Sequence, residues 1–312
     1  MRIALYVLLG IIGAVVLFYF FPTMLISNVI YTVLFVRTSK KKWTRSCNDY
    51  NEEQQQMFSE GLSWGEENES CRRRVTIKSG RYKLVGEYFD FGSKKCVIVI
   101  PGRMESGSYG YYFSDPYKQA GYNVLAIDNR SHGLSDGRIN NLGLKEYKDI
   151  LAWGKFLHDE CGIEEVVMHG ICIGAATALY ALTDKSCPEY MSALVADGMY
   201  ADFTDSFINH MIERKKPLFP FTQEVMGLIH LMSGRSVSKH APIRYIDKLK
   251  KPILFLYSKE DTSSTPDKGQ LLYDTANTDK KLVWFEKGMH SHLRINAVEQ
   301  YDRAIIDFLE EL

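Results

Sequence analysis

Six short apolar runs between residues 96 and 287 constrain the fold more than any other feature of this sequence. Each run is apolar along most of its length, which is typical of a strand buried on both faces of a sheet. The runs begin at Cys96, Tyr122, Glu164, Ser192, Lys251 and Lys281. Segments with helical periodicity lie between most of them. Strands that alternate with helices predict an α/β fold with a mostly parallel sheet and helices on both faces.

Two further strands are predicted upstream of these runs, which brings the expected sheet to eight strands. Arg73–Ser79 and Tyr82–Asp90 are strand-like and are separated by Gly80–Arg81, a pattern typical of a hairpin. The helical segments are expected at about residues 109–120, 144–161, 173–182, 267–276 and 295–309.

The N-terminus has a different character. Ile3 to Phe21 is a run of 19 residues without a charge, and the uncharged run continues to Val36. A membrane-spanning helix needs about 20 apolar residues, whereas the apolar region of a signal peptide is shorter and ends in a small-residue cleavage site. A buried core helix would normally show a polar face. We therefore expect residues 1–37 to form a membrane anchor that Pro22 ends or kinks, followed by an interfacial helix or an extension of the span.

Charge and composition limit the remaining possibilities. The chain has 38 basic and 38 acidic residues, so no basic surplus indicates a nucleic-acid partner. Basic residues flank the second end of the apolar run more heavily than the first, which predicts a cytoplasmic domain. The six cysteines form no CxxC or zinc-ligand spacing and weakly favour a reducing compartment.

Residues 38–71 are polar and are interpreted as a linker with one helical stretch near Glu52–Glu60, and residues 72–312 form the α/β domain. Within that domain more than 50 residues separate Asp197 from the strand at Pro252. We interpret about 200–245 as an insertion of short helices after the sixth strand that forms a lid, the alternative being a long connection without a gating role.

The segment from Gly170 to Gly174 reads Gly-Ile-Cys-Ile-Gly, between an apolar strand and an alanine-rich helix. This is the spacing of a nucleophile elbow, with Cys172 in place of serine. Small residues are needed two positions before and after the nucleophile, because larger side chains would collide with the strand and helix. A helix N-terminus favours negative charge, so it would stabilise a thiolate and an oxyanion at this turn.

Motifs spread over the domain support this interpretation. They are VIPGRMES, which ends at Ser106, DNRSHGLSDG (128–137), GICIGA (170–175), YSKEDTSSTP (257–266) and EKGMHSHL (286–293). Because these motifs occur in this order, the chain from about Arg72 resembles the α/β-hydrolase superfamily. Within that superfamily it resembles the bacterial membrane-anchored hydrolases of the serine aminopeptidase-like group. The cysteine is a departure from the usual serine in that group.

The resemblance implies the chain order nucleophile, acid, histidine. Cys172 is the nucleophile, Asp261 the favoured acid and His290 the favoured histidine, which takes the proton of the nucleophile and later activates water. Glu260 and Asp197 remain alternatives for the acid, and His292 for the histidine. Asp261 could also be a turn or N-cap aspartate, given its Ser/Thr-rich surroundings.

The oxyanion hole implied by the resemblance consists of two backbone N–H groups, those of Arg103 and Ile173. The side chain of Arg103 could also bind an anionic substrate, although a solvated loop arginine is the more common case.

These residues predict a membrane-anchored hydrolase that cleaves an ester, thioester or small amide through a Cys-His-Asp triad and a covalent acyl-enzyme. The expected partner is a small acyl substrate, for which the Phe and Met residues of the lid suggest an apolar group, and no nucleic acid, metal or cofactor is expected. A thioester is readily attacked by amines and thiols, so an acyltransferase is an alternative. A catalytically inactive binding protein is another, but it would predict the loss of the other triad residues.

Overall fold

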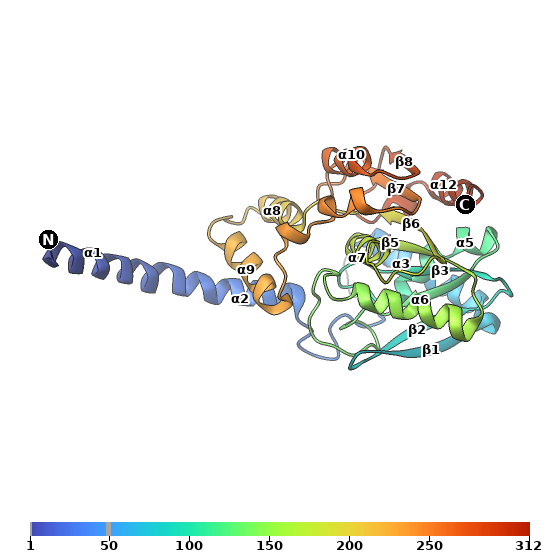
Figure 1. Cartoon of the computed structure of the whole chain (residues 1–312), viewed down its shortest axis with the longest axis horizontal. Helices are drawn as coiled ribbons and strands as arrows, with labels where there is room; N and C mark the ends of the chain where they lie inside the picture. Colours follow the sequence, from blue (N-terminus) through green and yellow to red (C-terminus); the bar gives the residue numbers. More distant parts are fainter. Residues whose placement is uncertain (1, 48–50) are drawn as a thin grey trace.

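An eight-stranded sheet organises the chain, as seen in a computed structural model that describes residues 2–47 and 51–312 (Figure 1). The strand order is β1-β2-β4-β3-β5-β6-β7-β8. The strands are β1 (Arg72–Ser79), β2 (Tyr82–Phe89), β3 (Lys95–Ile100), β4 (Asn123–Ile127), β5 (Glu165–Ile171), β6 (Met191–Asp197), β7 (Ile253–Ser258) and β8 (Lys280–Phe285).

The first two strands are antiparallel neighbours, and β2 is also antiparallel to β4. Every other pair in the sheet is parallel. The carboxyl ends of β3, β5, β6 and β7 therefore meet at one edge, where ligands bind in open parallel sheets. The predicted mostly parallel sheet of eight strands is confirmed.

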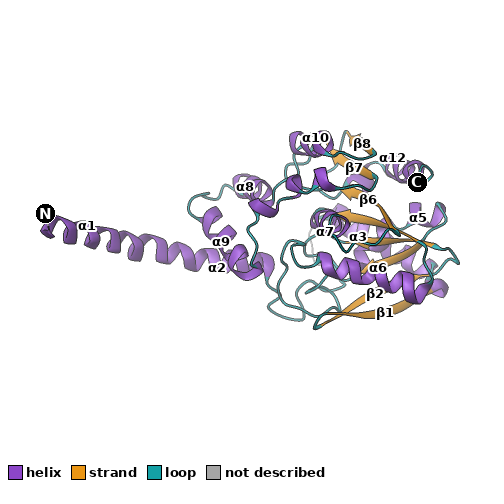
Figure 2. Ribbon diagram, in the orientation of Figure 1, coloured by secondary structure: helices purple, strands orange, loops and turns teal. Residues whose placement is uncertain are grey.

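Helices cover both faces of the sheet (Figure 2). One hydrophobic core includes side chains of α6 (Tyr147–Cys161), α7 (Ile173–Leu182) and α10 (Pro266–Thr275). The other includes side chains of α3 (Glu52–Glu67), α5 (Asp115–Gln119) and α12 (Val298–Leu309). Strand β3 contributes to both cores because its side chains alternate: Ile98 belongs to the first and Val97 to the second.

Two predicted helices are each divided in the structure. The helix expected at 109–120 is split into α4 (Gly107–Gly110), a 3₁₀ turn (Tyr111–Phe113) and α5. Pro116 lies in the first turn of α5, where a missing N–H is tolerated, so it begins a new helix instead of continuing the previous one. The helix expected at 295–309 is split into α11 (Leu293–Asn296) and α12.

The apolar N-terminus is one continuous helical rod, made of α1 (Arg2–Val15), a π-helical turn (Val16–Phe20) and α2 (Phe21–Phe35). Pro22 neither ends nor sharply interrupts it, because the wider π turn just before Pro22 accommodates the missing N–H and the ring. The helix continues to Phe35, and whether residues 24–36 extend the span or lie at the interface stays a prediction. Within the described residues, Arg2–Phe35 is long and apolar enough to cross a membrane, a test that a signal sequence or a buried core helix also passes.

The chain between β6 and β7 forms α8 (Phe203–Glu213), α9 (Phe221–Ser233) and three short 3₁₀ turns (Ser238–His240, Pro242–Arg244, Ile246–Lys248). We call residues 200–245 the lid segment. Helix α9 lies against α2 (Figure 1). The hydroxyls of Thr23 and Ser27 donate hydrogen bonds to the two oxygens of Glu224, at 2.8 and 2.7 Å.

The segment interpreted as a linker is largely packed on the domain, apart from residues 48–50, which lie outside the described residues. Its helix α3 is longer than expected and places Met57 in the second core. Gly61 and Gly65 let α3 approach closely, since a Cβ on either would lie 2.9 Å from Tyr112 N or 2.8 Å from the Tyr111 ring. Helix α3 is therefore part of the α/β domain.

Candidate active site

Cys172 occupies a sharp turn between β5 and α7. Its backbone has φ 52° and ψ −109°, an uncommon conformation for a residue with a side chain. The flanking glycines make the turn possible. A Cβ on Gly170 would lie 2.3 Å from Ala175 Cα, and a Cβ on Gly174 would lie 2.1 Å from the Ile100 oxygen. The crowding expected from the sequence is therefore present, and the thiol stands at the N-terminus of α7.

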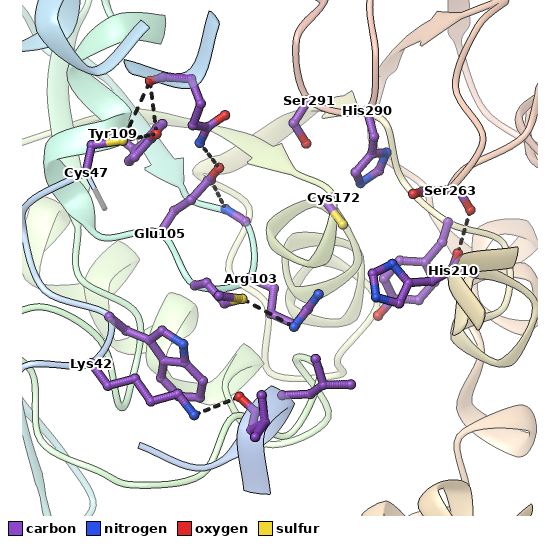
Figure 3. A pocket seen from close by; sticks show the side chains of 18 of the residues that line it. Lys42, Cys47, Arg103, Glu105, Tyr109, Cys172, His210, Ser263, His290 and Ser291 are labelled. Carbon is purple, nitrogen blue, oxygen red and sulfur yellow. Dashed lines mark hydrogen bonds between the residues drawn. The ribbon is translucent and has the colours of Figure 1, made fainter. Parts of the chain in front are cut away.

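His290 is brought beside Cys172 by the loop that follows β8, and its ring is directed toward the thiol (Figure 3). The Nδ1 atom of His290 lies 2.7 Å from Asp261 Oδ2. This bond leaves Nε2 as the nitrogen free to act on the thiol.

Asp261 is both a turn aspartate and the partner of His290. Its Oδ1 atom accepts hydrogen bonds from the backbone N–H groups of Ser263 and Ser264, both at 2.8 Å, while Oδ2 contacts His290. The turn thus fixes the carboxylate, whose side chain is 2% exposed, so that one oxygen faces the imidazole.

The alternative residues have other partners. Glu260 accepts a weak hydrogen bond from the Gly288 N–H at 3.3 Å. His292 contacts Glu53 Oε2 through Nδ1 at 2.8 Å and Gln54 Oε1 through Nε2 at 2.6 Å, so both ring nitrogens are engaged by α3. Neither residue takes the place of Asp261 or His290 beside Cys172.

Asp197, the other alternative acid, lies at the end of β6 beneath the site. Its Oδ2 atom accepts a hydrogen bond from the Tyr301 hydroxyl at 2.7 Å, and its Oδ1 atom has no partner among the described residues. Burial raises the pKa of Asp197 to about 7, partly offset by the Tyr301 hydrogen bond. A buried carboxyl with this pKa is only partly ionised at neutral pH, and Asp197 makes no hydrogen bond to His290 among the described residues, so it is less suited than Asp261 to orienting an imidazolium.

Two supporting residues were missed by the sequence reasoning. Gly198 has φ +58°, and a Cβ there would lie 3.3 Å from Cε1 of His290, so the missing side chain makes room for the imidazole. Glu105 accepts hydrogen bonds from the Gly102 N–H at 2.9 Å and from Gln54 Nε2 at 3.1 Å. Glu105 therefore connects the loop after β3 to α3 through these hydrogen bonds. In the sequence, the Asp197-Gly198 pair directly after the sixth strand is the feature that could have indicated a turn at Gly198.

The two expected oxyanion donors border the same site. Ile173 is the first residue of α7, and Arg103 lies in the turn after β3. Neither backbone N–H donates a hydrogen bond to another residue in the part of the chain that the structure describes. Neither group is therefore engaged by those residues, as a donor to an oxyanion requires.

A cavity of about 640 Å³ contains the thiol of Cys172 and the ring of His290. Its walls come from distant parts of the chain, among them the end of α2 with the following residues, the loop after β3, the lid segment and the loops after β7 and β8. Aromatic lid residues that line it are Tyr200, Phe203 and Phe207. The volume suits a small or medium acyl compound.

The electrostatics of the site act mainly on His290. Burial alone would lower the pKa of the His290 imidazole. The neighbouring Cys172 and Asp261 outweigh burial and raise that pKa well above its usual range.

Among the described residues, no group of three or more His, Cys, Asp or Glu side chains could hold a metal ion. The six cysteines are free thiols.

Comparisons with known proteins agree with the fold. The family model for the alpha/beta hydrolase fold matches residues 95–222. The "Uncharacterized protein YqkD" of Bacillus subtilis is 27% identical over 219 residues, which is 70% of this chain and 70% of that protein. With the eight-stranded sheet and the elbow, the chain has the α/β-hydrolase fold, and these similarities support a hydrolase.

Solved structures give the same result. The esterase Pf2001 of Pyrococcus furiosus has a TM-score of 0.64 and 25% identity, over 79% of this chain and 93% of that chain. An alpha-beta hydrolase of Vibrio vulnificus has a TM-score of 0.59 and 18% identity, over 88% of this chain and 99% of that chain. At this level of identity the second similarity concerns the fold alone.

Proposed function

We propose that this protein is a membrane-anchored hydrolase that cleaves an ester, thioester or small amide through a covalent thioester on Cys172. The observation that carries the proposal is the strained turn that holds the thiol in one cavity with His290, whose Nδ1 is 2.7 Å from Asp261. The esterase among the similar structures is consistent with an acyl substrate.

In the first half of the reaction, the Cys172 sulfur attacks the acyl carbon while its proton resides on Nε2 of His290. The Arg103 and Ile173 N–H groups bind the developing oxyanion. When the tetrahedral intermediate collapses, the bond to the leaving group breaks and His290 gives its proton to the departing alcohol, thiol or amine. Asp261 keeps the imidazole in position and stabilises its charge.

In the second half, water replaces the leaving group. His290 takes a proton from the water as its oxygen attacks the thioester carbon, and the same N–H groups bind the second oxyanion. The carbon–sulfur bond then breaks, which releases the carboxylic acid and returns Cys172 to the thiolate paired with the His290 imidazolium.

The anchor is proposed from the helix Arg2–Phe35. Ile3 to Phe21 would extend about 28 Å as a helix, close to the hydrocarbon thickness of a bilayer. The following turns contact the lid segment through Glu224, and Phe219 of the lid contacts the ring of Phe20. These contacts support a membrane boundary close to Pro22. The basic residues after Val36 favour a cytoplasmic domain.

The proposal is tested by intact mass spectrometry of the full chain in detergent. The protein is mixed with 4-nitrophenyl esters and acyl thioesters of increasing chain length. We expect an acyl adduct on wild type that is absent in Cys172→Ala and that decays in water. Cys187→Ala is the matched control, since Cys187 is a partly buried thiol outside the cavity and its loss should leave the adduct unchanged.

The adduct distinguishes the candidate functions. Decay only after addition of an amine or thiol would identify an acyltransferase. An adduct that persists in Cys172→Ala, or no adduct with any ester or thioester, would contradict the proposed nucleophile.

A further inference from the structure

Basic residues line the cavity that contains the nucleophile. Lys42 follows the apolar helix, Arg103 lies in the loop after β3, and His210 lies on helix α8 of the lid segment; all three line the cavity that contains Cys172. Arg214, just after α8, is close enough to lower the pKa of Arg103 and of His210, in addition to the effect of burial. These basic residues belong to three separate segments of the chain, so they come together only in the folded protein.

Protein carboxylates do not balance this charge. Among the described residues, no carboxylate lies within 4.0 Å of the Arg103 guanidinium, whose one hydrogen bond is a weak contact from Nη1 to the Met104 sulfur at 3.4 Å. Glu105 is the nearest acidic candidate in the cavity wall, but both of its oxygens are occupied by Gly102 and Gln54. Burial also raises the pKa of Glu105.

The ammonium group of Lys42 is also engaged in hydrogen bonds within the protein. Its Nζ atom donates to the carbonyl oxygens of Thr32, Val33 and Val36, at 3.1, 2.7 and 2.6 Å. It therefore caps the end of α2, where a cation is favourable. Arg103 and His210 are left with polar groups directed into the cavity and no charged or hydrogen-bonded protein partner beyond Met104 in the described part of the chain.

We propose that Arg103 and His210 form a binding site for an anionic group, a carboxylate or a phosphate, carried by the acyl substrate. The site rests on the proposed function, because the anion would lie beside the acyl carbon held at Cys172 (Figure 3). A guanidinium offers two parallel N–H groups to such an anion, and a neutral imidazole adds one more donor. Such a site would define the substrate class of the proposed hydrolase as acidic acyl compounds in preference to neutral ones.

The test compares two matched esters on the full chain in detergent: mono-4-nitrophenyl adipate, which is anionic, and its neutral methyl ester. Charge-assisted hydrogen bonds are expected to favour the anionic ester in kcat/KM by about 10- to 100-fold. Arg103→Gln should abolish this preference, and Arg103→Lys should keep part of it. The control is Arg303→Gln, on an exposed arginine of α12, which should keep the wild-type ratio.

A second measurement reports anion binding without turnover. Adipate should slow the alkylation of Cys172 by iodoacetamide in wild type and in Arg303→Gln, but not in Arg103→Gln. A further pair of substrates, short-chain phosphatidylglycerol and phosphatidylcholine, identifies the source of the anion. A preference for phosphatidylglycerol alone indicates a lipid headgroup, and a preference for the adipate ester indicates an acidic acyl chain.

The outcomes separate this inference from the proposed function. Turnover of the neutral ester with no anionic preference and no protection by adipate would overturn the anion site and leave the hydrolase intact. Protection that depends on Arg103 without turnover of any ester would support the anion site and contradict the hydrolase. A preference that survives in Arg103→Gln would also overturn the inference.

Discussion

Asp197→Asn should change how the stability of the protein depends on pH. Asp197 is fully buried, one of its oxygens has no partner among the described residues, and burial raises its pKa to about 7. The unfolded chain releases this proton near pH 4. Between these values the folded state binds one proton more than the unfolded state, so the free energy of unfolding falls as pH rises.

The magnitude follows from the two pKa values. In the middle of this window each pH unit lowers the free energy of unfolding of the wild type by about 1.4 kcal/mol, so about 2 kcal/mol is lost between pH 5 and pH 7 and little more above it. Asparagine resembles the protonated carboxyl in shape and cannot ionise. Relative to wild type, Asp197→Asn should therefore gain up to about 3 kcal/mol of stability between pH 5 and pH 8.

Urea unfolding of the full chain in detergent, followed by tryptophan fluorescence at pH 5 and pH 8, measures this difference. Asp274→Asn is the control, because its carboxylate lies on the exposed face of α10 and, among the described residues, accepts a hydrogen bond only from Gln270. Asp197→Asn should also keep acyl loading, whereas Asp261→Asn should lower its rate at least about 100-fold. Equal pH dependence in wild type and Asp197→Asn would refute the assigned protonation, and loss of loading in Asp197→Asn would refute the choice of Asp261.

Two other contacts give sharp predictions. Gly174→Ala adds a Cβ 2.1 Å from the Ile100 oxygen, so we expect a loss of about 3 kcal/mol and of acyl loading, measured by unfolding and mass spectrometry. Gly227→Ala is its control, because no atom lies within 4 Å of the added Cβ. Glu224→Leu removes the acceptor of the buried Ser27 hydroxyl, which should weaken the contact between α2 and α9 by about 1–3 kcal/mol and raise hydrogen exchange in α9 about 10-fold or more. Gln223→Leu, at an exposed neighbouring position, should leave exchange unchanged, and equal exchange in both variants would contradict the role of Glu224.

The sheet and the elbow could be predicted from the sequence because their signals are local. Parallel strands buried on both faces are continuous apolar runs, and the turn at Cys172 requires glycine at two fixed positions. Helix α7 begins at Ile173 and ends at Leu182, as the pattern predicts. The triad candidates follow, since the ends of neighbouring strands carry Cys172, Asp261 and His290 to one edge of the sheet.

The surroundings of the site could not be predicted in the same way, because they depend on contacts between distant segments. The polar sequence of α3 resembles a linker, yet Gly61 and Gly65 let it pack on the domain, and Gln54 reaches both Glu105 and His292. Likewise, no local pattern relates Ser27 to Glu224, which is 197 residues away. A hydroxyl in an apolar helix is compatible with lipid, with a core or with a partner helix, and only the fold distinguishes them.

The contact between the apolar helix and the lid segment bears on which substrates can reach Cys172. If the membrane boundary lies near Pro22, the cavity residues Val33 and Leu34 stand about 17 Å farther along the same helix. An acyl group held there is outside the hydrocarbon layer, so a substrate must leave the bilayer or come from solution. An anionic group offsets the cost of leaving lipid, since it already prefers water and Arg103 would bind it beside the nucleophile. The position of the cavity and its unbalanced positive charge therefore favour the same class of substrate, an acidic acyl compound at the membrane surface.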